Sequence, residues 1–217
     1  EDDISFQSKF VDACGSAGIK AEIFDPQEAL RIEPSINPSI IGAVKVPDGS
    51  VDPFRLSVAN AIDARNHGAT ILIQHEVVGF VMEQDIIKGV SLYNHLTKES
   101  ITVYSKITVN ASGVWGHNIA KLAGININMY PAKGALLIFG HRVNNKVINR
   151  CRKPADADIL VPGDTISLIG TTSSHISYDE IDNMRVTKEE VDVLLREGAK
   201  LAPALASTRI LRAYAGV

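Results

Sequence analysis

The sequence predicts an α+β fold, in which an antiparallel sheet with flanking helices accompanies a remnant of α/β structure. Strand-like runs rich in β-branched residues follow one another in the middle of the chain, as in a β-meander. One such run then passes through small residues directly into a helical pattern, which is typical of open α/β sheets. Further strand-like runs and a well-capped helix fill the last third, and these favour the antiparallel sheet.

A short helical pattern near the N-terminus and a turn-rich segment reach to about Ser50, and a stronger helix signal follows. Asp52 can accept hydrogen bonds from the first turn, Pro53 suits the first helical position, and Gly68 suits the stop. The predicted buried face of this helix consists of Phe54, Val58, Ala61 and Ile62. The strands of the middle region are expected at residues 70–74, 77–82, 87–93, 101–104 and 106–110.

After the small residues that end this region, residues 117–123 have helical spacing and Gly124 is a stop signal. Later strands are expected at residues 134–139, 158–161, 165–169 and 210–214. A last helix is predicted from the capping box of Thr187 and Glu190, and Pro203 would end it. Its core face would be Val191, Leu194 and Leu195.

Composition favours a small soluble ligand over a polymer or a lipid surface. The net charge is −3, and acidic and basic residues are mixed, so no basic face indicates nucleic acid. The two cysteines, Cys14 and Cys151, lie far apart without neighbouring ligands, which argues against a disulfide framework and a zinc site. No apolar run approaches the roughly 18 residues of a membrane span.

The segment from Val109 to Trp115 is the most informative for function. Ala111, Ser112 and Gly113 have little or no side chain, so the backbone can approach a bulky ligand closely. The helix start that follows presents unpaired amides toward anionic groups. A plain tight turn between a strand and a helix is the alternative, because a local fold pattern alone does not define a ligand-binding site.

Several landmarks, read in order, resemble FAD-dependent amine and glycerol-phosphate oxidoreductases. The early ones are Val51-Asp-Pro, Gly68-Ala-Thr, Val77-Val78 and Asn110-Ala-Ser-Gly. The later ones, which look like FAD-linked glycerol-3-phosphate dehydrogenases, are Gly170-Thr-Thr172, Thr187 with Glu189-Glu190, Pro203 and Arg212-Ala-Tyr-Ala-Gly-Val217. Residues 149–154, 156–158 and 161–164 resemble the anaerobic type, so the likeness covers essentially the whole chain.

The resemblance implies two domains, one of them incomplete. Residues 1–50 and 125–217 would belong to a substrate domain built as an antiparallel sheet with helices. Residues 51–124 would be the rear part of an FAD-binding domain of the DAO and glutathione-reductase-like type. The Gly-x-Gly-x-x-Gly turn that grips a dinucleotide pyrophosphate is not in the sequence. We therefore expect a fragment that binds FAD weakly or not at all and is inactive in isolation.

Site residues follow from the resemblance position by position. Val78 would offer backbone hydrogen bonds to the adenine end of FAD, and Ala111, Ser112, Gly113 and Trp115 would line its path toward the isoalloxazine. For Val78, a plain core position is the alternative.

On the substrate side, Thr171 would face substrate, unless its hydroxyl is satisfied by a turn. Lys133 could place positive charge near phosphate or flavin, unless it is simply solvated. The basic residues Arg150, Arg152 and Lys153 could attract a phosphate ester, and a solvated loop face is the alternative.

The sequence assigns no catalytic base. Aerobic relatives carry a histidine and an aspartate where this chain has Leu136 and Ser173, so neither role transfers. His141, beside Arg142, is a weak substitute, because a lone histidine after a strand is usually a surface residue. The remaining histidines show no partner spacing in the sequence: His67, His75, His95, His117 and His175.

The activity that the resemblance implies is oxidation of sn-glycerol 3-phosphate to dihydroxyacetone phosphate, with FAD accepting the hydride and electrons passing to quinone. Membrane-anchoring and iron-sulfur partner subunits are implied with it, as is a cytoplasmic location, peripheral on the inner face of the cell membrane. An amino-acid oxidase or dehydrogenase of the same flavin family is the alternative enzyme. A non-catalytic scaffold or binding subunit is the alternative from another class.

Overall fold

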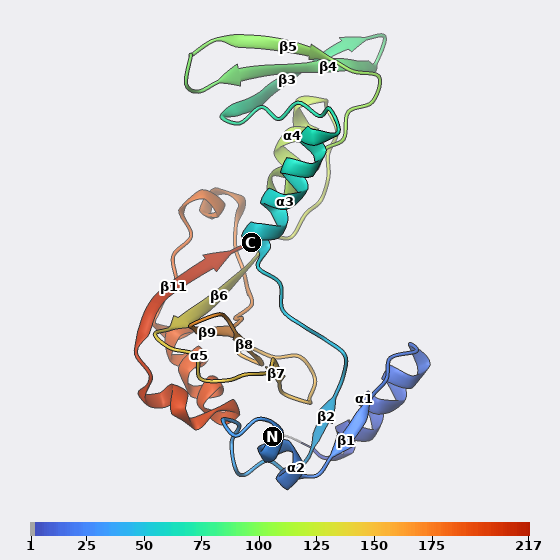
Figure 1. Ribbon diagram of the computed structural model, residues 1–217. Helices are drawn as coiled ribbons and strands as arrows, with labels where there is room; N and C mark the ends of the chain where they lie inside the picture. The colour runs from blue at the N-terminus through green and yellow to red at the C-terminus, as the bar shows by residue number, and fades with distance from the viewer. Residues whose placement is uncertain (1–2) are drawn as a thin grey trace. The chain divides into compact units, whose positions relative to one another are not determined.

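The computed structural model describes residues 3–217, and these divide into two compact units. One unit contains the residues up to Ser50 together with Pro131–Val217, and the other is Val51–Tyr130. Every strand pair in both units is antiparallel, and helices accompany the sheets, so the predicted α+β class is confirmed (Figure 1). Within residues 3–217, no helix combines the length and apolar character that a membrane span requires.

The larger unit is built around a six-stranded antiparallel sheet. Its order is β10-β6-β9-β8-β7, and β11 also pairs with β6. The strands are β6 Ala132–Phe139, β7 Ile148–Asn149, β8 Ile159–Pro162, β9 Ser167–Gly170, β10 Ser174–His175 and β11 Ile210–Gly216. The four strands predicted for this part of the chain are therefore confirmed as β6, β8, β9 and β11, with boundaries shifted by one or two residues.

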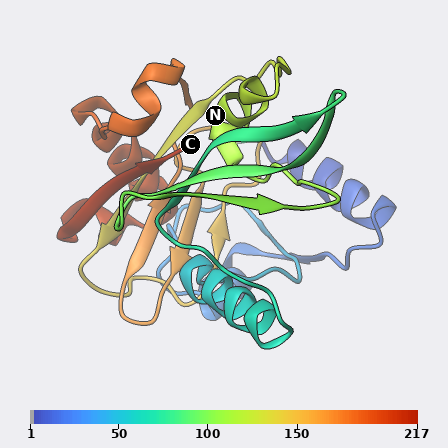
Figure 2. The same ribbon diagram turned by 90° about the horizontal axis from the view of Figure 1, so that it is seen from above.

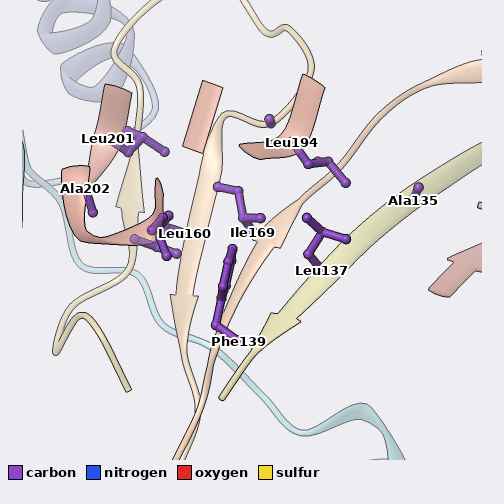
Figure 3. Packing of buried hydrophobic residues seen from close by; sticks show 10 residues of the cluster. Ala135, Leu137, Phe139, Leu160, Ile169, Leu194, Leu201 and Ala202 are labelled. Carbon is purple, nitrogen blue, oxygen red and sulfur yellow. The ribbon is translucent and has the colours of Figure 1, made fainter. Parts of the chain in front are cut away.

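One face of this sheet is covered by helix α5, Lys188–Leu201. Its capping box is present as predicted, because Thr187 Oγ1 accepts from the Glu190 N–H at 3.3 Å and a Glu190 carboxylate oxygen accepts from the Thr187 N–H at 2.8 Å. Leu194 is fully buried, whereas Val191 and Leu195 pack on the core edge. Figure 3 shows Leu194 grouped with Leu137 and Ile169 on this face of the sheet.

Short elements complete the larger unit. They are α1 Ser5–Ser16, β1 Glu22–Phe24, α2 Pro26–Ile32, β2 Ala43–Lys45 and the 3-10 helices η2 Tyr178–Asn183 and η3 Pro203–Ser207. Strands β1 and β2 pair with each other. The buried Glu33 carboxylate accepts from the backbone N–H groups of Asn145 and Lys146, at 2.6 and 2.8 Å, and so attaches this N-terminal part to the sheet region.

The smaller unit combines a three-stranded meander with two α-helices. Its elements are α3 Pro53–Asn66, β3 His75–Glu83, β4 Ile86–Asn94, β5 Ser100–Tyr104, the 3-10 helix η1 Gly113–Trp115 and α4 Gly116–Leu122. Strands β3, β4 and β5 lie side by side in that order, as Figure 2 also shows in green. The predicted start and stop of α3 are confirmed, since Asp52 accepts from the N–H groups of Phe54 and Arg55 and Gly68 has φ +91°.

The predicted buried face of α3 is wrong. Phe54 is 77% exposed and Val58 is 58% exposed, and Ala61 and Ile62 are exposed too. The spacing of these side chains does form one apolar stripe, but no element within residues 3–217 packs on it. Amphipathic spacing shows which face a helix would bury, and burial still requires a partner surface.

Two of the five strands predicted for the middle region are also not formed. Residues 70–74 and 106–110 have strand-like composition but no ladder partner within residues 3–217. Ile73, Ile107 and Val109 are 75%, 81% and 79% exposed. β-Branched residues favour strands mainly through packing and pairing with neighbours, so composition alone does not form a strand here.

Candidate functional site

The bend after residue 109 is held by the side chain of Asn110. The Asn110 amide N–H donates to the carbonyl of Gly116 at 2.9 Å, across the whole bend. Its amide oxygen accepts from the Ser112 hydroxyl at 2.6 Å and from the Ser112 N–H at 3.3 Å. One side chain therefore connects the beginning of the bend to its middle and to the start of α4.

The bend leaves open space beside its backbone. Gly113 has φ +58°, a left-handed conformation that side chains disfavour, and a Cβ placed there would meet no atom within 4 Å. Ala111 and Gly113 are exposed, and Trp115 is 46% exposed. The backbone at Gly113 is therefore accessible from this side.

Val78 lies in the same unit, at an irregular point of β3. Val77 pairs with Leu92 and Gly79 pairs with Ser91, so Val78 is the extra residue of a β-bulge. Val78 is 45% exposed, so it is not part of a core formed within residues 3–217. Because α4 contacts β3, the helix that follows the bend packs against the strand that carries Val78.

A second cluster of polar side chains lies where α5 begins. The Lys133 ammonium group is 2.9 Å from the Glu190 carboxylate, and it also donates to the Arg185 carbonyl at 2.9 Å. The Thr172 hydroxyl contacts the same carboxylate at 3.3 Å and accepts from the Ala135 N–H at 3.0 Å. Glu190 thus connects strand β6, the segment after β9 and the start of α5.

The Lys133 and Glu190 side chains are only 10% and 12% exposed. Burial raises the pKa of the Glu190 carboxyl, but the Thr187 N–H, the Lys133 ammonium and the Thr172 hydroxyl together hold it below its ordinary value of 4.5. Glu190 is therefore a carboxylate near neutral pH, and its charge compensates that of Lys133.

These contacts show that the solvated alternative for Lys133 is wrong, because the side chain is buried and paired. Thr171 is exposed and lies beside Gly134, where a Cβ on the glycine would be 3.4 Å from Thr171 Cβ. The buried neighbour Thr172 makes the network contacts, which leaves the Thr171 side chain on the surface.

The basic residues near position 150 are neither a solvated face nor a free phosphate clamp. Arg150 is 2.8 Å from Glu197, and Arg152 donates to Asp158 at 2.6 and 3.0 Å. Both guanidinium groups are therefore occupied by internal ion pairs, and only Lys153 of this set is exposed. The sequence did not indicate the Arg150–Glu197 pair because Glu197 lies on α5, distant in sequence.

Leu136 is half-buried on β6 and Ser173 is exposed, and neither can serve as a base. His141 is exposed after β6.

The sequence analysis found no partner for His95, but its Nε2 lies 2.8 Å from the Glu76 carboxylate. The two residues meet because strands β3 and β4 form a hairpin, and their spacing in the sequence does not show this. Residues 3–217 contain no cluster of three His, Cys, Asp or Glu side chains suited to a metal ion.

Asn110→Ala is expected to loosen the bend, because three hydrogen bonds are lost at once. Trp115 is the single tryptophan of the chain, so acrylamide quenching of its fluorescence reports on this bend directly. We expect stronger quenching and a destabilisation of about 1–2 kcal/mol. Asn118→Ala, on the exposed side of α4, is the matched control and should leave quenching unchanged. Equal quenching in the two variants would contradict this role of Asn110.

Glu190→Gln is expected to lower the free energy of unfolding by about 3 kcal/mol, because it leaves the buried Lys133 charge unpaired. Asp192→Asn removes a charge from the exposed Lys188–Asp192 pair, with side chains 83% and 54% exposed, and should cost far less because solvent screens this pair. Urea unfolding of both variants measures the difference.

The same pair predicts a pH dependence. Since the folded-state pKa of Glu190 is lowered, its contribution is complete above pH 4.5 and is lost as the pH falls through the lower folded value. The wild-type chain should lose stability over this acidic range, whereas the Glu190→Gln curve should be flatter there. Parallel curves would show that Glu190 does not contribute to acid sensitivity.

Comparison with known proteins places these features in a family. A family model described as FAD dependent oxidoreductase matches residues 2–217. A curated relative, a subunit of the anaerobic glycerol-3-phosphate dehydrogenase from Escherichia coli (strain K12), is 63% identical over 217 residues, which are 100% of this chain and 40% of that protein. The chain therefore spans about 40% of the length of this relative.

Solved structures show the same fold. L-proline dehydrogenase from P. horikoshii has a TM-score of 0.78 at 27% identity, covering 99% of this chain and 57% of that chain. Glycerol-3-phosphate dehydrogenase from Bacillus halodurans, complexed with FAD, has a TM-score of 0.76 at 22% identity, covering 91% of this chain and 43% of that chain. Because the family model covers almost the whole sequence, this chain belongs to the FAD-dependent oxidoreductase family.

Proposed function

We propose that this chain is part of a flavoprotein that oxidises sn-glycerol 3-phosphate to dihydroxyacetone phosphate. The observation that carries the proposal is the 63% identity, over all 217 residues, to the E. coli anaerobic glycerol-3-phosphate dehydrogenase subunit. When bound, FAD would supply the acceptor for the hydride from C2 of the substrate. We expect the isolated 217-residue chain to be inactive, because it spans about 40% of that relative.

In this proposal, residues 51–124 are the rear part of the FAD-binding domain, and residues 1–50 and 125–217 belong to the substrate domain. The exposed apolar stripe of α3 and the exposed β-branched residues of segments 70–74 and 106–110 support an incomplete domain. Surfaces of this kind normally lie against further structure in a stable domain. We infer that the additional length of the relatives supplies the missing partner elements.

The residues of the smaller unit fit a flavin dinucleotide. The bulged backbone of Val78 is outside the regular β3–β4 register, so it is suited to hydrogen-bond an adenine. Ala111, Ser112, Gly113 and Trp115 would line the path toward the isoalloxazine, and the open space beside Gly113 would allow close approach to the backbone there. Asn110 would hold this bend in place before the cofactor arrives.

In the larger unit, Thr171 would face substrate from its exposed position beside Gly134. Lys133 would bring positive charge close to this region, although Glu190 compensates much of it. Its contribution to the site is therefore to fix the segment that carries Thr171, through Glu190 and Thr172.

Partner subunits are part of the proposal. The E. coli relative is by name one subunit of its enzyme. We infer membrane-anchoring and iron-sulfur subunits that receive electrons and pass them to quinone, and a cytoplasmic location, peripheral on the inner face of the cell membrane.

A second candidate is an amino-acid dehydrogenase, favoured by the likeness to L-proline dehydrogenase at a TM-score of 0.78 and 27% identity. A chimera in which this chain replaces the matching 217 residues of the E. coli relative distinguishes the two. We expect the chimera to reduce a quinone analogue with glycerol 3-phosphate and not with proline or glycine. Turnover of the amino acids alone would contradict the proposal.

The isolated chain offers an independent test of the cofactor assignment. Without the pyrophosphate-binding turn, we expect little or no flavin absorbance after purification, and weak or no binding of added FAD. The chimera, which regains that region, should be yellow with one FAD per chain. A yellow isolated chain with stoichiometric FAD would show that the truncation argument is wrong.

A further inference from the structure

Residues 150–158, between β7 and β8, form a loop that one buried side chain closes. The Asp158 carboxylate accepts from the Arg152 guanidinium at 2.6 and 3.0 Å and from the Ala155 N–H at 2.7 Å. The Asp158 carbonyl accepts from the Arg150 N–H at 3.0 Å, which brings the two ends of the loop together. Asp158 is only 6% exposed, so water competes little for these hydrogen bonds.

The loop is attached to α5 through Glu197. The Arg150 guanidinium donates to the Glu197 carboxylate at 2.8 Å, and the Arg152 guanidinium lies 3.9 Å from it. The exposed side chains of Arg196 and Lys200 contact the same carboxylate from α5 itself. Because a buried carboxylate is costly without its partners, Glu197 and Arg150 hold the start of the loop against the helix.

The end of the loop contacts the residue that would face substrate in the proposed function. The Ala157 N–H donates to the Thr171 carbonyl at 2.9 Å, and Ala157 is fully buried. Ala157 has φ +58°, a left-handed conformation that residues other than glycine rarely adopt. Such a backbone persists only where its surroundings constrain it. The closed loop supplies this constraint, because Asp158 bonds to Arg152 and Ala155 on the N-terminal side of Ala157.

The peptide unit between Thr171 and Thr172 is held on both edges. Its carbonyl, from Thr171, accepts from the Ala157 N–H of the loop. Its N–H, from Thr172, donates to the Ala135 carbonyl of β6 at 3.2 Å. A peptide unit is planar, so two hydrogen bonds on opposite edges fix its orientation. The direction of the exposed Thr171 side chain is therefore set by β6 and by the loop together.

We propose that Asp158 is a positioning residue, which acts on the Thr171 hydroxyl through the closed loop and the Ala157 N–H. This inference rests on the proposed function, in which Thr171 faces substrate. Thr171 makes the contact with substrate, and Asp158 determines where the hydroxyl lies. A displacement of about 1 Å is enough to weaken such a contact strongly, although Asp158 itself does not touch the substrate.

A double-mutant cycle in the chimera, with glycerol 3-phosphate as substrate, tests this inference. Thr171→Ala and Asp158→Asn should each lower kcat/KM by about 10-fold, because one removes the hydroxyl and the other misplaces it. The double variant should also lose about 10-fold rather than about 100-fold, since Asp158 has nothing to position once the hydroxyl is absent. A role of Asp158 in stability alone does not produce this coupling. Flavin absorbance and the urea midpoint are measured for every variant.

Arg152→Lys provides a second route to the same measurement if Asp158→Asn retains no FAD. Lysine keeps the charge but lacks the planar fork that donates twice to the Asp158 carboxylate. The loss in kcat/KM should be smaller, about 3-fold, and it should also disappear in the Thr171→Ala background.

Glu33→Gln is the matched control. Glu33 is a buried carboxylate of the same unit, 4% exposed, and its hydrogen bonds go to Ser35, Asn145 and Lys146 rather than to the Thr171 segment. The variant should lower the urea midpoint but change kcat/KM less than about twofold, with or without Thr171→Ala.

Additive losses for Asp158→Asn and Thr171→Ala would overturn the inference, and so would full activity of Thr171→Ala. Both results leave the proposed function intact, because the wild-type chimera still oxidises glycerol 3-phosphate. A wild-type chimera that oxidises only amino acids would instead contradict the proposed function.

Discussion

Packing of α5 against one face of the antiparallel sheet is the constraint on which the larger unit depends. Leu194 meets side chains of β6 and β9, so every second residue of these strands is committed to the core. The alternation then places the intervening β6 residues, Gly134, Leu136 and Ile138, on the opposite face of the sheet. A shift of one residue in β6 would exchange the two sets, burying Leu136 and exposing Leu137. The burial of a few aliphatic side chains thus determines which groups lie on the opposite face of the sheet.

Glu190 connects this core to the surface. Glu190, which completes the capping box in the first turn of α5, also neutralises Lys133 and contacts Thr172. A capping interaction alone contributes modestly to helix stability, but a buried ion pair must be kept complete, because an unpaired buried charge is costly. The same carboxylate therefore secures the helix start and the segment that presents Thr171. Stability and the position of the Thr171 segment are therefore coupled at one residue.

Local signals predicted local structure well. Asp52, Pro53 and Gly68 act within a few residues of themselves, and the start and stop of α3 agree with them. Burial and pairing depend on partners distant in sequence. The Lys133–Glu190 pair joins positions 57 residues apart, and neither residue carries a local sign of the other. The predictions of a buried face on α3 and of a strand at residues 70–74 were wrong for a related reason. Composition indicates a preference for burial or for strand pairing, and only a neighbouring element can satisfy it.

The bend at residues 110–116 shows how a site can keep its shape within a unit that exposes so much apolar surface. Its main contacts are local, since Asn110 bonds to Ser112 and Gly116 within the same loop. Local hydrogen bonds of this kind need no partner element, whereas the exposed Ile107 and Val109 just before them do. The backbone that would face the cofactor is thus formed by its own sequence, while the strand leading into it depends on other polypeptide. This division explains why the small-residue bend could be predicted from the sequence although the neighbouring strand prediction was wrong.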